Sequence, residues 1–99
     1  MTTNEMIEKL ITEKNYDRAQ TERLAPKIDA LPEDIRSALE AWVETGETNS
    51  PEYGGYTAAE ILKAQPQFTV LGAYLTLDWM RRDPKTAAAA LKRPFMRRG

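Results

Sequence analysis

Residues 68–82 have the sequence FTVLGAYLTLDWMRR, in which apolar side chains recur at helical spacing. The apolar side chains form two stripes, the first Phe68, Leu71, Leu75 and Trp79, and the second Val70, Tyr74 and Leu77. A helix that is apolar on most of its circumference is usually buried. We therefore predict a helix over about residues 68–82 that forms the centre of the fold.

The segments on either side of this stretch also carry helix boundary signals. Thr57 and Glu60 have the spacing of a capping box, which predicts a helix start, and Pro66 predicts the end of that short helix. Asp83 is a favoured N-cap residue and Pro84 a favoured first residue. A further helix is therefore expected from Pro84 to shortly before Pro94.

A clear amphipathic helix is predicted upstream, over about residues 32–45. Pro32 suits the first turn, and Gly46 is a natural stop. Apolar residues follow one another at spacings of three or four, which predicts a core-facing stripe. The residues of this stripe are Ile28, Leu31, Ile35, Leu39 and Trp42.

Residues 4–24 are also expected to be helical, with Met6 and Leu10 on an apolar face. Asn15 and Tyr16 interrupt the pattern, so the sequence is compatible with either one helix or two. Pro26 is expected to end this segment because it lacks an amide donor.

These segments predict an all-α fold, a compact bundle of about five short helices with one mid-chain loop at residues 46–56. We predict a single domain over residues 1–99, with residues 94–99 as a flexible tail. Both tryptophans, Trp42 and Trp79, are expected to be largely buried.

The composition argues against catalysis. The chain has 99 residues with no cysteine and no histidine, which removes thiolate nucleophiles, cysteine-based metal sites and the usual neutral-pH base. Glu40 and Glu44, and Asp29 and Glu33, form carboxylate pairs, but such pairs are common on acidic helices. We predict no enzymatic activity, no cofactor, no metal and no small-molecule substrate.

The cellular location is predicted from the lack of a signal-peptide pattern and of a membrane-spanning stretch. The first residues lack the basic start and apolar run of a signal peptide. The longest charge-poor stretch, residues 64–77, is too short to span a bilayer. A soluble, cytoplasmic protein with no membrane contact is expected.

Charge is unevenly placed along the chain. Residues 1–65 hold 13 acidic and 7 basic residues, whereas residues 66–99 hold 2 acidic and 7 basic residues. The basic third could bind phosphates, it could face a protein partner, or it could dock against the acidic first half of the same chain. Basic residues at helix C-termini also complement the helix dipole.

Residues 57–82 have the gross anatomy of a helix-turn-helix. A recognition helix needs polar side chains near its N-terminal end. Here that end reads Thr-Val-Leu-Gly-Ala, and the arginines lie at the far end. Nucleic-acid binding by the basic C-terminal third, with residues 57–82 as a degenerate helix-turn-helix, is therefore the alternative function.

The mid-chain loop is the other candidate contact site. Tyr53 and Tyr56 flank two glycines, and tyrosine offers both apolar area and a hydroxyl. Glycine allows a partner's backbone to approach closely. An interaction loop is one interpretation, and a loop folded back on the bundle is the other.

Taken together, these patterns favour a protein-interaction module that acts as an adaptor, a regulator or a self-associating domain. Its partner is expected to be another protein or a second copy of itself. The residues predicted to contact the partner are Tyr53, Tyr56, Arg81, Arg82 and Arg93.

Overall fold

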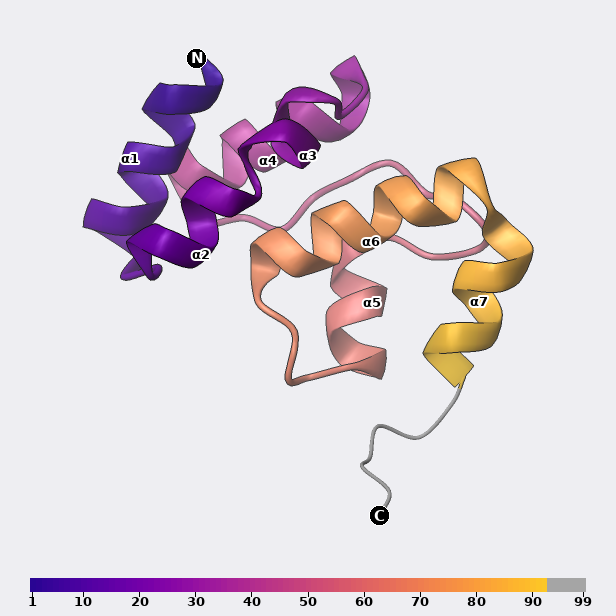
Figure 1. The fold of residues 1–99 in the computed structure, drawn as a ribbon. Coiled ribbons are helices and arrows are strands. Elements are labelled where there is room, and N and C mark those ends of the chain that lie inside the picture. The colour runs from indigo at the N-terminus through magenta and orange to yellow at the C-terminus, as the bar shows by residue number, and fades with distance from the viewer. Residues whose placement is uncertain (93–99) are drawn as a thin grey trace.

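A computed structural model of the chain describes residues 1–92 (Figure 1). The predicted tail, residues 94–99, and the candidate contact residue Arg93 lie outside the described residues. Within residues 1–92 the fold is all-α, as predicted, and it comprises seven helices rather than about five. These are α1 (Thr3–Lys14), α2 (Arg18–Arg23), α3 (Ala25–Asp29), α4 (Glu33–Thr45), α5 (Ala58–Ala64), α6 (Val70–Arg82) and α7 (Pro84–Lys92).

The N-terminal segment forms two helices, which settles the question that the sequence left open. Asn15 ends α1 in the left-handed conformation, at φ 64°, and the Tyr16 amide donates to the Leu10 carbonyl at 3.1 Å. The Asp17 carboxylate then caps α2 by accepting from the Gln20 amide at 2.9 Å. The break thus arises from a left-handed residue followed by a new N-cap.

Pro26 is followed by a helix and not by a loop. It lies in the first turn of α3, where its missing amide costs no hydrogen bond. Two contacts hold α3 against its neighbours: Arg36 of α4 donates to the Ile28 carbonyl at 3.2 Å, and the Thr3 hydroxyl donates to the Asp29 carboxylate at 2.8 Å.

The predicted helix boundaries in the second half are largely confirmed. Thr57 and Glu60 form the capping box of α5. Thr69 caps α6, so Phe68 lies in the preceding turn and not in the helix. Asp83 follows α6 and accepts from the Thr86 amide at 3.4 Å, which caps α7.

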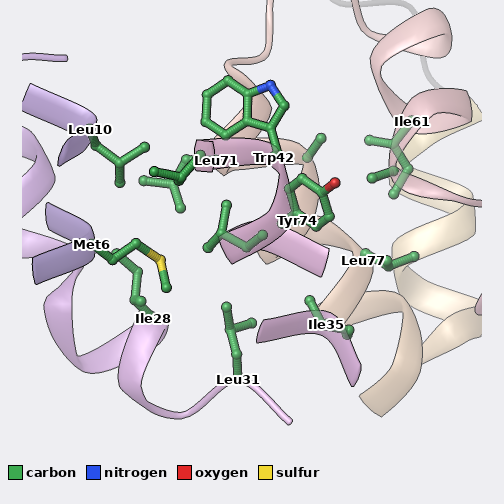
Figure 2. Packing of buried hydrophobic residues seen from close by; sticks show 14 of the residues in the cluster. Met6, Leu10, Ile28, Leu31, Ile35, Trp42, Ile61, Leu71, Tyr74 and Leu77 are labelled. Carbon is green, nitrogen blue, oxygen red and sulfur yellow. The ribbon is translucent and has the colours of Figure 1, made fainter. Parts of the chain in front are cut away.

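Helix α6 is the centre of the structure, as predicted. It packs against α4, α5 and α7, while α1 packs against α2, α3 and α4 (Figure 1). Figure 2 shows Tyr74 of α6 inside the cluster formed by the side chains of several helices. The buried apolar side chains of α6 are Leu71, Ala73, Tyr74, Leu77 and Met80.

The two apolar stripes of α6 are not equally buried. Tyr74 and Leu77 are completely buried, whereas Leu75 and Trp79 are only partly buried. Trp42 is buried as expected, at 8% exposure, and Trp79 is less fully buried but still packs against the core. The buried arc of α6 is centred on Tyr74 and Leu77, and at about 100° per residue Trp79 lies outside this arc.

Residues 46–57 cross the molecule alongside α6 (Figure 1). Gly46 ends α4 in the left-handed conformation, at φ 83°. The Tyr74 hydroxyl donates to the Asn49 carbonyl at 2.8 Å, and the Ala58 amide donates to the Ser50 hydroxyl at 2.8 Å. The loop is thus fastened to α6 and to the start of α5.

Tyr74 also makes the free energy of unfolding change with pH in the alkaline range. Burial raises the pKa of its phenol to about 12, from an ordinary value of 10.0. Between these pH values the unfolded chain has released a proton that the folded chain still holds, so the free energy of unfolding falls as the pH rises. Tyr74→Phe is expected to show a shallower decline above about pH 10 in urea titrations. Equal slopes in both proteins would contradict this assignment.

None of the helices within residues 1–92 has the length and apolar composition that crossing a membrane requires.

Candidate functional site

The loop residues Tyr53 and Tyr56 form a tight hairpin. Their backbones exchange two hydrogen bonds, from the Tyr53 amide to the Tyr56 carbonyl at 2.9 Å and from the Tyr56 amide to the Tyr53 carbonyl at 3.0 Å. Gly54 and Gly55 between them have φ values of 60° and 86°, the left-handed pair that a two-residue turn of this kind requires. Both tyrosines are partly buried and pack against the core.

The space beside Gly54 is filled by a side chain of the same protein, that of Met80. A Cβ atom at this position would lie 2.5 Å from both Cγ and Sδ of Met80 on α6. The glycine therefore lets the hairpin pack on α6, and its free space is not open to a partner. The interpretation of a loop folded back on the bundle accounts for this part of the hairpin.

Tyr53 connects the hairpin to the start of α4. Its hydroxyl donates to the carboxylate of Asp34 at the start of α4. This hydrogen bond raises the pKa of the Tyr53 phenol, while the charge of Arg81 acts in the opposite direction. The charge of Arg81 is thus felt at Tyr53, and Tyr56, like Tyr53, packs against the core.

Arg81 and Arg82 are both held by one acidic residue of their own helix. Asp78 is 8% exposed, and its Oδ1 accepts from Nε and Nη2 of Arg81 at 3.0 and 2.9 Å. Its Oδ2 accepts from Nε of Arg82 at 3.1 Å. The spacings of three and four residues place the three side chains on one face of α6.

A cleft of about 550 Å³ opens between this face of α6 and α3. Such a volume lies within the range of roughly 300–1,000 Å³ that small ligands or anchoring side chains occupy. Its walls combine apolar side chains with charged ones. The cleft is lined by Pro26, Lys27, Ala30, Leu75, Thr76, Asp78, Trp79, Arg81 and Arg82.

The basic C-terminal third does not dock on the acidic first half through ion pairs in the part of the chain that the structure describes. Arg81 and Arg82 pair with Asp78, which itself belongs to this third. Lys85 and Lys92 are exposed. The basic side chains between residues 66 and 92 are therefore turned to solvent or to their own helix.

The helix-turn-helix alternative meets a geometric difficulty. Leu71 and Ala73, in the first turn of α6, are buried and present nothing to a DNA groove. At the end of α5, the Gln65 side chain is held against α7, where it donates to the Leu91 carbonyl at 3.2 Å. The arginines lie at the opposite end of the helix.

The carboxylate pairs do not form a shared acid or metal site. Glu40 pairs with Arg36 at 3.5 Å, whereas Asp29 and Glu33 belong to different helices. No cluster of three or more metal-ligating side chains occurs within residues 1–92.

Sequence reasoning missed several residues of the cleft. Asp78 carried a usable signal, because an acid three and four residues before two arginines predicts ion pairs along a helix. No sequence signal indicates that Pro26 and Lys27 line the cleft, since their position opposite α6 depends on how α3 packs. Trp79 was assigned to the core rather than to a wall of this cleft.

Comparisons of this chain with protein-family models, with curated proteins and with solved structures give no match.

Proposed function

We propose that this protein is a non-catalytic protein-interaction module that holds its partner in the cleft between α3 and α6. The observation that carries this proposal is the partly exposed ring of Trp79 beside two guanidinium groups anchored on Asp78. Tryptophan and arginine are the residue types that contribute most binding energy at protein interfaces.

The anchoring by Asp78 favours binding. A long side chain that is free in solution loses about 0.5–1.5 kcal/mol of conformational freedom when a partner immobilises it. Here Asp78 already restrains Arg81 and Arg82 before a partner arrives. A smaller part of the binding free energy is then lost to ordering these side chains.

Nucleic-acid binding remains the alternative because Lys27 and Arg82 are exposed cations that line the same cleft, and Lys85 is a further exposed cation. It makes a distinct prediction: affinity for DNA or RNA would fall steeply with salt concentration. The protein-contact proposal instead requires the apolar wall of the cleft, which phosphate binding does not use.

Selection from a random-peptide display library tests the proposal. The wild-type protein is expected to enrich peptides, and Trp79→Ala is expected to lose most of that enrichment because the apolar wall is gone. Leu62→Ala provides a control, since Leu62 is a partly buried apolar residue of α5 outside the cleft. Circular dichroism checks that each variant is folded.

An amide chemical-shift titration decides between the two functions. The enriched peptide is expected to shift residues 26–30 and 75–82, while mixed-sequence duplex DNA and single-stranded RNA leave them unchanged at low salt. Shifts caused by nucleic acid and lost as salt rises would replace this proposal with the alternative. Peptides that bind Trp79→Ala as well as wild type would also overturn it.

A further inference from the structure

The charge of the cleft between α3 and α6 distinguishes it from a second hollow near the N-terminus. A hollow of about 610 Å³ near the N-terminus is lined by Glu5, Glu8 and Glu44 with one lysine, so it is acidic. The cleft between α3 and α6 holds three cations, Lys27, Arg81 and Arg82, and one anion, Asp78. Its formal charge is positive, which suits an acidic ligand.

The hydrogen-bonding capacity of the two arginines is only partly used. Arg81 binds Asp78 through Nε and Nη2, and Arg82 binds it through Nε alone. Within residues 1–92, Nη1 of Arg81 and both terminal nitrogens of Arg82 have no protein acceptor. These N–H groups match the geometry of a carboxylate, which can accept two of them at once.

The remaining lining of the cleft is apolar. Leu75 and Trp79 of α6 lie opposite Pro26 and Ala30. Such a wall gains free energy only from an apolar side chain placed against it. The ligand must therefore combine a carboxylate with a neighbouring apolar group.

From these contacts we infer that the cleft binds an acidic peptide segment in which a large apolar side chain lies beside an aspartate or glutamate. The apolar side chain packs against Trp79 and Leu75, and the carboxylate accepts from Arg82. This inference rests on the proposed function and names the partner's chemistry. A phosphodiester backbone would leave the apolar wall unused.

The experiment uses the peptides enriched by the full chain. They are expected to contain acidic residues next to Leu, Ile, Phe or Trp far more often than the unselected library does. The most enriched peptide is then synthesised in two forms, one with each acid replaced by its amide, and both are measured by isothermal titration calorimetry. The neutral form is expected to bind about tenfold more weakly.

Variants of the protein test whether Arg82 binds the carboxylate of the peptide. Arg82→Gln keeps most of the side-chain stem and is expected to raise the Kd of the acidic peptide about tenfold, while changing that of the neutral peptide much less. Lys63→Gln on α5 is the matched control, because it removes an exposed cation outside the cleft. The Kd of the acidic peptide for Lys63→Gln is expected to stay within about twofold of the wild-type value, since remote charges are screened.

The outcomes separate this inference from the proposed function. Peptides that require Trp79 but contain no acid, or that bind equally well to Arg82→Gln, would overturn the inference and leave the proposed function standing. A selection that enriches no peptide would overturn both. Acidic peptides that lose affinity with both Trp79→Ala and Arg82→Gln, but not with Lys63→Gln, support both.

Discussion

Tyr74→Ala is expected to lower the free energy of unfolding by about 3–5 kcal/mol, the usual cost of deleting a large buried aromatic side chain. Tyr74 has no exposed surface and lies at the middle of the buried arc of α6. Helices α4, α5 and α7 all pack on α6, so the resulting cavity would border the central packing of the fold. The measurement is a urea denaturation curve followed by circular dichroism.

Tyr74→Phe separates packing from hydrogen bonding. It keeps the ring and removes only the hydroxyl that donates to the Asn49 carbonyl at 2.8 Å. The expected cost is about 0.5–1.5 kcal/mol, the net value of one such hydrogen bond. A loss below about 1 kcal/mol for Tyr74→Ala would mean that α6 does not bury this face.

The second large effect is expected for Trp42→Ala, at about 3–5 kcal/mol. The Trp42 ring packs against Tyr16, with ring centroids 6.3 Å apart, and Lys14 Nζ lies 4.8 Å from its ring centroid. The substitution removes this aromatic pair and the cation–π contact as well as the buried area. Helix α1 and the turn that follows it would lose this part of their contact with α4.

Trp79→Ala is the matched comparison, because it removes the same side chain from a partly exposed site. Its expected cost is about 1 kcal/mol, the typical size for a substitution without a large cavity. The two single-tryptophan proteins also report exposure directly: iodide is expected to quench Trp79 emission more strongly than Trp42 emission. Equal costs together with equal quenching would contradict the placement of Trp79 at the cleft.

These two substitutions also separate stability from binding. Trp42→Ala is expected to weaken the fold without altering the cleft between α3 and α6. Trp79→Ala is expected to leave a folded protein that has lost the apolar wall for its partner. A variant that stays folded and fails to bind is therefore the informative one for function.

Part of the candidate site could be predicted from the sequence. Arg81 and Arg82 stand out because they follow a long apolar run, and Tyr53 stands out beside its two glycines. The structure brings Arg81 near Tyr53 and the Asp34 carboxylate. Lys27 could not be predicted, because about fifty residues separate it from the arginines that it faces across the cleft.

The sequence by itself determined the helical class and most helix ends. The capping box of Thr57 and Glu60, the left-handed stop at Gly46 and the restart at Pro84 depend on atoms only a few residues apart. Such local interactions are present in any context that leaves the backbone free to form a helix. They could therefore be predicted without knowing the tertiary arrangement.

Only the tertiary structure decided which face of α6 is buried and where the cleft lies. The buried side chains come from both apolar stripes, Leu71 from the first and Tyr74 and Leu77 from the second, and which of them are buried depends on how α4, α5 and α7 pack on α6. The same packing places Met80 over Gly54 and leaves Trp79 facing α3. These outcomes depend on contacts between residues far apart in the chain, for which local propensity carries no information.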